Sequence, residues 1–238
     1  MFLLASLATV ATLLSPVVTP RDTTLGANQS VACGLGPASS PAVANDLRAA
    51  LDAHNGAVRW DPRRGVVRLW VQRRPAIAAD VSVLGADWRR AIAVAADAWS
   101  DVVPGLAFAI ESDSSRADVI VTWERDLQSA PADGDFAFLT AGRTTLVPAS
   151  DGRALAAHVR LAIFAPSGER YSVDDVRAVA RHELGHALGL AHHAAPTSVM
   201  APLVRAERLS DDDRATLRAL YALPIGARCA HSTQTSGK

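Results

Sequence analysis

The amino-acid sequence predicts an α+β domain in which helices pack on one mixed, twisted sheet. Three observations predict this class: a segment in which apolar and polar residues alternate, a segment with helical spacing of apolar residues, and two serine-capped helices near the C-terminus. The chain has 238 residues, of which 49% are hydrophobic and 20% are charged. This length and composition suit one domain with a sizeable core.

The first half of the domain is expected to contain a strand, a helix and two more strands. Residues 58–72 form two extended runs around turn residues, and in the second run apolar residues alternate with arginine, tryptophan and glutamine. Residues 86–103 suit a helix, because large apolar side chains and alanine recur three or four positions apart until Pro104. Residues 106–111 and 117–124 then have the composition of strands.

The second half is expected to contain two further strands and two helices. The strands are predicted at residues 139–148 and 158–165, after a segment, 125–137, that is rich in turn and loop residues. A serine can cap each of the two helices, which are predicted at residues 173–188 and 210–223. Aspartates follow each serine and favour the positive end of the helix dipole.

The chain divides into four expected segments. These are a signal peptide or N-terminal anchor at 1–20, a linker or short pro-segment at 21–57, a folded domain at 58–225 and a tail at 226–238. The apolar start has the length of a signal peptide but lacks a positive charge at its beginning. We expect export, with an uncleaved membrane anchor or a cytosolic apolar N-terminus as alternatives. Within the second segment, a short helix could form at residues 42–54.

Charge and cysteine content narrow the class of protein further. The formal net charge is zero at pH 7, which argues against a nucleic-acid-binding protein. The two cysteines, Cys33 and Cys229, are expected to form a disulfide if the protein is exported.

Four of the seven histidines lie between residues 182 and 193, in the stretch HELGHALGLAHH. On a helix, His182 and His186 share one face and can bind one metal ion, while Glu183 beside them can act on a metal-bound water. Gly189 can take a positive φ and turn the chain, so that His192 returns as a third ligand. Three protein ligands with one open position are typical of catalytic zinc.

Two other interpretations of this stretch remain. One is an amphipathic helix with incidental histidines, which leaves their spacing unexplained. The other is a metal site without catalysis, in which Glu183 would have no role. His193 is expected at the surface or behind the ligands, because adjacent residues cannot both point at one metal ion without distortion.

Two segments of the chain resemble the metzincin zinc peptidases with their Met-turn. They are His182-Glu183-Leu184-Gly185-His186-Ala187-Leu188-Gly189-Leu190-Ala191-His192 and, after it, Ser198-Val199-Met200. Within that clan it is most similar to the matrixins, including compact bacterial members, over residues 58–225. The resemblance implies a metzincin-like catalytic domain with an active-site helix, a Met-turn and a C-terminal helix. It also implies an endopeptidase that acts on protein or peptide substrates, as a monomer, with one catalytic zinc ion.

The resemblance assigns roles to individual residues. The histidines at 182, 186 and 192 would be the zinc ligands and Glu183 the general base. Met200 would form a floor under the metal, and Pro202 with Leu203 would line the pocket for the residue after the scissile bond. The strand around Leu139–Thr144 would form a rim along which an extended peptide binds. Asp212 and Asp213 would tie the last helix to the Met-turn and to the mature N-terminus.

The sequence also departs from the family pattern. Ala191 and His193 replace an acidic residue and a serine, and an aromatic residue is missing after Pro202. The family's second, structural zinc is not expected, because residues 125–165 hold one histidine. Calcium at Asp133 or Asp135 is an alternative to a solvated turn, which the composition favours.

Alternatives also remain for Cys33 and for the function. Cys33-Gly34 faintly resembles the pro-segment stretch in which a thiolate holds the zinc, although the disulfide is favoured. The alternative functions are a zinc-containing peptide-binding or adhesion module, which would not need Glu183, and an amidohydrolase for non-protein amides. The N-terminal segment also leaves membrane association open.

Overall fold

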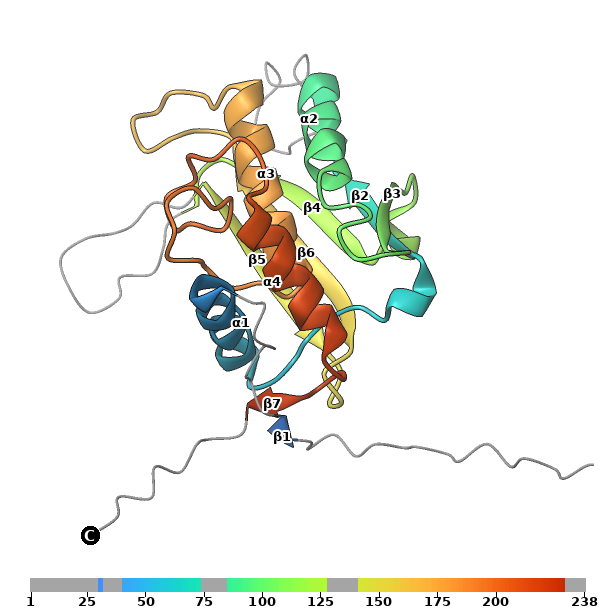
Figure 1. Ribbon diagram of the computed structural model, residues 1–238. Helices are drawn as coiled ribbons and strands as arrows, with labels where there is room; N and C mark the ends of the chain where they lie inside the picture. Colours follow the sequence, from blue (N-terminus) through green and yellow to red (C-terminus); the bar gives the residue numbers. More distant parts are fainter. Residues whose placement is uncertain (1–29, 32–39, 74–84, 128–140, 230–238) are drawn as a thin grey trace, which may run out of the picture.

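The computed structural model describes residues 30–31, 40–73, 85–127 and 141–229. The strands are β1 (Ser30–Val31), β2 (Val66–Val71), β3 (Ala107–Ile110), β4 (Val119–Glu124), β5 (Gly142–Pro148), β6 (Ala154–Ala162) and β7 (Arg228–Cys229). The α-helices are α1 (Pro41–His54), α2 (Gly85–Asp97), α3 (Val173–Ala187) and α4 (Asp211–Ala222). Figure 1 shows their arrangement.

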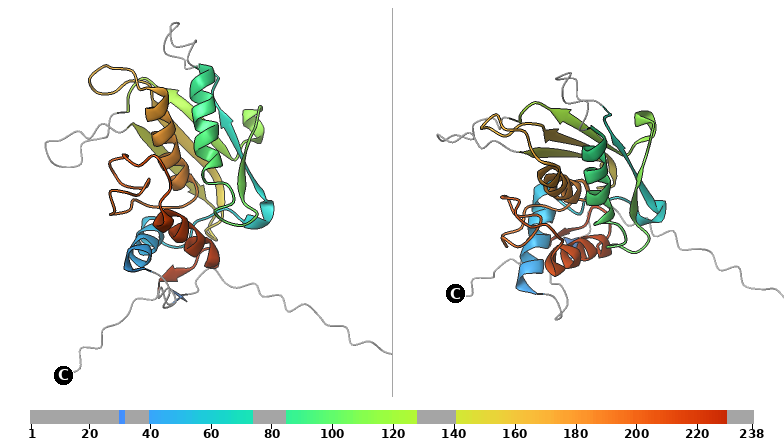
Figure 2. Two further views of the ribbon diagram at one scale, coloured as in Figure 1. Left: turned by 45° about the horizontal axis from the view of Figure 1, so that its top comes forward. Right: turned by 90° about the horizontal axis from the view of Figure 1, so that it is seen from above.

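One five-stranded sheet, in the order β3-β2-β4-β6-β5, forms the main scaffold. Four neighbouring strands run parallel, and β5 runs antiparallel to β6 at the end of the sheet. Burial alternates along β4, with Val119, Val121 and Trp123 buried, because successive side chains point to opposite faces. Helices α2 and α3 pack against each other on one face (Figure 2), so the predicted α+β class with a mixed sheet is confirmed.

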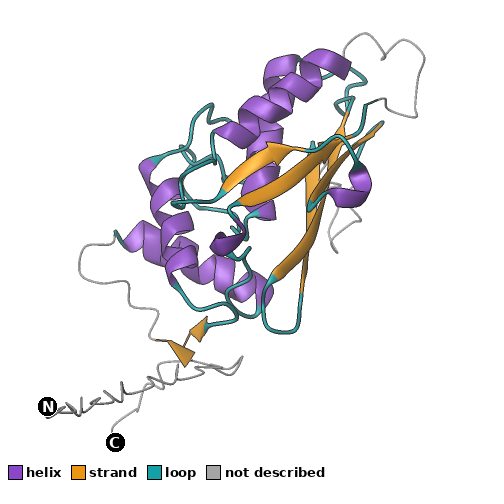
Figure 3. Ribbon diagram, turned by 90° about the vertical axis from the view of Figure 1, so that its right-hand side faces the viewer, coloured by secondary structure: helices purple, strands orange, loops and turns teal. Residues whose placement is uncertain are grey.

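A second group of elements lies at one end of α3. Helix α4 packs against α1, and β1 pairs in parallel with β7 beside them (Figure 1). Figure 3 shows this pair of short strands apart from the main sheet. Helix α1 begins after Ser40, whose hydroxyl accepts a hydrogen bond from the Val43 amide. Val43, Leu47 and Leu51 of α1 are buried, and burial of each side chain stabilises the fold by roughly 1.5–3 kcal/mol. Helix α1 is therefore an integral part of the fold.

Three boundaries differ from those that the sequence predicts. Helix α2 ends at Asp97 and not near residue 103, because the Trp99 and Ser100 amides donate to carbonyls three residues back and Asp101 takes a positive φ of 59°. Strand β6 begins at Ala154, since its alanine-rich start already pairs with β5, and the ladder with β4 follows from Ala157. The first extended run of 58–72 forms only an isolated bridge, at Arg59.

The expected helix within the segment 21–57 is present as α1. Among the described residues, no helix combines the length and apolar character needed to span a membrane.

Candidate metal centre

Helix α3 carries two of the candidate ligands and begins at a reciprocal cap. The Ser172 hydroxyl accepts from the Asp175 amide at 3.1 Å, and the Asp175 carboxylate accepts from the Ser172 amide at 3.0 Å. His182 and His186 lie one turn apart near the other end, and their ring centroids are 4.6 Å apart. Glu183 is therefore on the helix beside the first of them.

The end of α3 sends the chain back towards the same two histidines. Gly189 takes a φ of 100°, and its amide donates to the His186 carbonyl at 2.9 Å. The Leu190 amide donates to the Gly185 carbonyl at 3.1 Å, which completes a glycine-terminated helix end. A Cβ atom at Gly189 would collide with the Val58 carbonyl oxygen, so both the φ and the space at this position require glycine.

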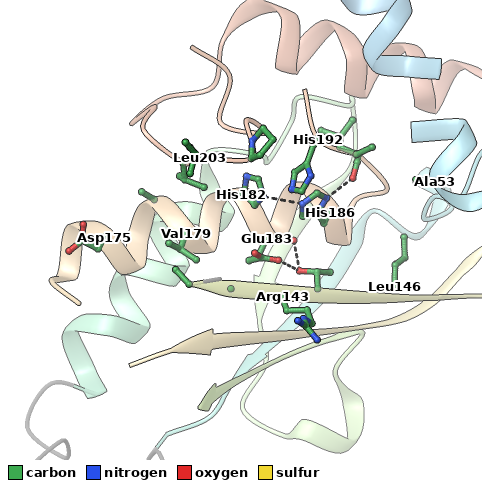
Figure 4. A pocket seen from close by; sticks show the side chains of 18 of the residues that line it. Ala53, Arg143, Leu146, Asp175, Val179, His182, Glu183, His186, His192 and Leu203 are labelled. Atoms are coloured by element: carbon green, nitrogen blue, oxygen red, sulfur yellow. Dashed lines mark hydrogen bonds between the residues drawn. The ribbon is translucent and has the colours of Figure 1, made fainter. Parts of the chain in front are cut away.

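The structure brings His182, His186 and His192 together (Figure 4). One ligand atom from each lies within 4.8 Å of the other two. The Nδ1 atoms of His182 and His186 lie 2.7 and 2.8 Å from the carbonyl oxygens of Val199 and Leu190, respectively. Each Nδ1 therefore carries the proton and donates, which leaves each Nε2 with a lone pair for a metal ion.

Burial keeps the first two imidazoles neutral. It lowers the pKa of His182 to about 4 and the pKa of His186 to about 3. Neutral imidazole is the form that binds metal, and three nitrogen donors with an open side facing the cleft suit zinc. The donor set and its protonation therefore fit a zinc ion.

Glu183 is held against strand β5. Its Oε2 accepts a 2.6 Å hydrogen bond from the Thr144 hydroxyl, and its Cγ and Oε1 lie against Gly142. Burial raises the pKa of Glu183 to about 7, while the hydrogen bond from Thr144 and the charge of Arg143 oppose that rise. A carboxyl group with this pKa can both accept and release a proton near neutral pH.

Met200 is fully buried, and its sulfur lies against Gly185 of α3. A Cβ atom at Gly185, between these histidines on α3, would collide with the Met200 sulfur. The glycine thus lets the methionine side chain pack directly under the helix. The Met200 amide donates to the Ser198 hydroxyl at 2.9 Å, which fixes the turn that carries it.

Asp213 of α4 anchors this turn. Its carboxylate accepts from the Ser198 hydroxyl, from the Val199 amide at 3.2 Å and from the Ser210 amide at 2.8 Å. Burial acts to raise the pKa of Asp213, but hydrogen bonds, led by those from His193 and Ser198, outweigh it and lower the pKa to about 2. Because the Val199 carbonyl orients His182, this carboxylate supports a candidate ligand through the turn.

His193 points away from the three-histidine cluster. It is buried, so it does not lie at the surface, and its Nδ1 is 3.1 Å from Asp213 and 3.5 Å from Asp46 of α1. Asp212 instead contacts the Ser40 hydroxyl, at 3.4 Å. The aspartates at the start of α4 therefore connect to the Met-turn and to α1.

The three histidines and Glu183 line an open cavity of about 690 Å³. Strand β5 forms one side, and it is the last strand of the sheet among the described residues. Pro202 and Leu203 line the cavity, and Leu203 is 70% exposed. Figure 4 shows Leu203 and Ala53 of α1 on opposite sides of the histidines.

Several predicted residues lie outside the described part of the chain. These are Cys33, Asp133, Asp135 and the start of the rim predicted at Leu139–Thr144. The disulfide between Cys33 and Cys229 and the calcium alternative therefore stay predictions. The pairing of β1 with β7 brings the chain near Cys33 towards Cys229.

Sequence reasoning missed three contributors to the site. The sequence predicts Thr144 only as part of a peptide rim, and Asp46 and His54 fall in the segment predicted as a linker or pro-segment. The contact of a hydroxyl with a buried carboxylate, or of a helix with a distant part of the chain, leaves no local pattern in the sequence. Ser40 as a cap and Pro41 at the first helical position are local signals for the start of α1.

Comparison with known proteins gives a consistent set of relatives. The family model described as Matrixin matches residues 77–222. Human matrix metalloproteinase-20 is 31% identical over 56% of this chain and 27% of its own length. Human matrix metalloproteinase-25 is 50% identical over 20% of this chain and 10% of its own length. Drosophila melanogaster matrix metalloproteinase-2 is 53% identical over 18% of this chain. The matches thus span about a quarter or less of these relatives (27%, 10% and 6%).

Proposed function

The chain belongs to the matrixin family, and from this premise we propose that it is a zinc-dependent endopeptidase. The family match confirms the resemblance that the histidine stretch and the Met-turn indicated. The observation that carries the proposal is the convergence of three neutral-imidazole donors and one buried carboxylate in a single open cleft. A site that only bound metal would not need Glu183 at that position.

His182, His186 and His192 would hold the zinc ion. When bound, zinc supplies Lewis acidity, which polarises a carbonyl group and lowers the pKa of water to about 7. Glu183 accepts the proton of the attacking water and delivers it to the leaving amine. Thr144 holds the Glu183 carboxylate in place during both transfers, through the 2.6 Å hydrogen bond.

Strand β5 is the edge strand of the sheet that the described residues form, and its outer backbone groups would pair with an extended peptide, which would add to the sheet as a further strand. Pro202 and Leu203 would contact the residue that follows the scissile bond. We expect protein or peptide substrates, one catalytic zinc ion, a monomer, and a location outside the cytoplasm reached by export or by an N-terminal anchor. Calcium at Asp133 or Asp135 stays an alternative that no described residue supports.

The decisive experiment compares the zinc-loaded full chain with Glu183→Gln on a mixed peptide library. The parent should cleave, whereas Glu183→Gln should bind about one zinc per chain and lose at least about 1,000-fold in kcat/KM. Glu169→Gln, at an exposed position outside the cleft, is the matched control and should behave as the parent.

Two results would count against the proposal. Equal cleavage by the parent and Glu183→Gln would remove the glutamate from the mechanism. Zinc binding by the parent without cleavage of any peptide would favour the peptide-binding or adhesion module.

A further inference from the structure

Helix α1 lies outside the segment that matches the family, yet it reaches the candidate active site. The family match begins at residue 77, whereas α1 spans Pro41–His54. Ala53 and His54, in its last turn, line the same cavity as the three histidines. The proposed substrate cleft therefore has a wall that the family-matched segment does not supply.

Contacts at both ends and along its length fix α1 in this place. At its start, the Ser40 hydroxyl contacts Asp212, and in its middle Asp46 faces His193. Beyond its end, the Ala57 amide donates to the Ala227 carbonyl at 2.8 Å. These contacts tie α1 to α4, to the loop that carries His192 and to the C-terminal strand, so its last turn has a defined position beside the cleft.

The position of this wall along the cleft follows from β5. Thr144 contacts Glu183, and Leu146, two residues further along the strand, lines the cavity together with Ala53 and His54. A strand rises about 3.3 Å per residue, so Leu146 lies about 7 Å from Thr144 along the cleft. An extended peptide has the same rise, and its residue beside Leu146 is therefore about two residues from the scissile bond.

We propose that α1 forms a specificity-determining wall of the cleft, where Ala53 and His54 select the substrate side chain about two to three residues before the scissile bond. The direction rests on the proposed function, in which Leu203, on the other side of the histidines in Figure 4, contacts the residue after that bond.

The lining of this subsite indicates which side chains it accepts. Leu146, Leu190 and Ala53 present apolar groups. His54 is half-buried, and burial lowers the pKa of its imidazole, which is therefore neutral at pH 7. The subsite thus suits an apolar side chain of medium size.

The test compares the cleavage profiles of the zinc-loaded full chain and three variants on one peptide library. Ala53→Glu puts a negative charge into the subsite and should lower kcat/KM for apolar residues at this substrate position by about tenfold, with a gain for lysine and arginine. His54→Ala should change the preference at the same position. Asn45→Glu adds the same charge to the same helix at an exposed position outside the cleft and should leave the profile unchanged.

The preference for the residue after the scissile bond should stay constant in all three variants. An unchanged profile in both Ala53→Glu and His54→Ala would overturn the proposal, and so would an equal loss at all substrate positions. The same library is also incubated with immobilised, zinc-loaded Glu183→Ala protein, with and without Ala53→Glu, and bound peptides are sequenced. If the parent cleaves nothing, the proposed peptidase activity is refuted. A change in the residues of the bound peptides with Ala53→Glu would still support the specificity wall formed by α1. An unchanged set of bound peptides would refute that wall.

Discussion

Replacement of Gly142 by alanine should separate catalysis from zinc binding. A Cβ atom at this position would lie 2.6 Å from both Cγ and Oε1 of Glu183 and 2.8 Å from Cγ1 of Val179. Comfortable carbon contacts are about 3.5–4.0 Å, so the overlap is about 1 Å. Gly142 has no positive φ, and alanine therefore adds no backbone strain.

The side chains of Glu183 and Val179 are the groups that must move. Gly142 is paired with Leu161 in the ladder between β5 and β6, and this pairing resists movement of the strand. The carboxylate would leave its place by about 1 Å, a displacement that can cost about 100-fold in rate, or about 2.7 kcal/mol of transition-state stabilisation. The three atoms nearest to the added Cβ belong to Glu183 and Val179 and not to a histidine, so zinc affinity should stay within about twofold of the parent.

The assay measures kcat/KM on a cleaved peptide, zinc content after dialysis and the thermal unfolding midpoint. Thr145→Ala, at the exposed position on the opposite face of β5, is the matched control and should retain full activity. Full activity of folded Gly142→Ala protein would refute the reasoning that glycine at this position leaves room for the base. A parallel loss of zinc and activity would refute the separation of the two functions.

Three further predictions concern the groups around the cleft. Thr144→Val removes a hydrogen-bond donor that lowers the pKa of Glu183. The acidic limb of the pH profile should therefore move to higher pH, and kcat/KM at pH 7 should fall about tenfold. Thr144→Ser keeps the hydroxyl donor and should restore the pH profile and kcat/KM. Because the pKa of Asp213 is lowered to about 2, from an ordinary 3.8, its ionised form should stabilise the fold by about 2 kcal/mol above pH 4, a contribution lost as the pH falls towards 2. Urea unfolding of Asp213→Asn protein should show a correspondingly smaller stability loss over that acid range, and an unchanged pH dependence would contradict the assignment. His192→Ala should lose most of the zinc in metal analysis, whereas His193→Ala should keep it but unfold at lower temperature, and equal zinc loss in both would overturn the ligand assignment.

The sequence alone determined the elements whose signals are local. A serine before an aspartate-rich first turn predicted α3 and α4, because the cap satisfies backbone donors within the same few residues. Gly189 predicted the turn at the end of α3, since a positive φ is strained for other residues. The ligand spacing within this stretch likewise follows from helix geometry.

Only the tertiary structure decided which groups from distant segments meet at the cleft. Thr144 reaches Glu183 across 39 positions of the chain, and Asp46 faces His193 although α1 precedes the family-matched segment. Such contacts depend on how the sheet and helices pack. The sequence around a single hydroxyl or carboxylate does not indicate which distant group it contacts. The local chain therefore determines the candidate ligands and the helix ends, whereas packing between distant elements decides the support of the proposed base and the walls of the cleft.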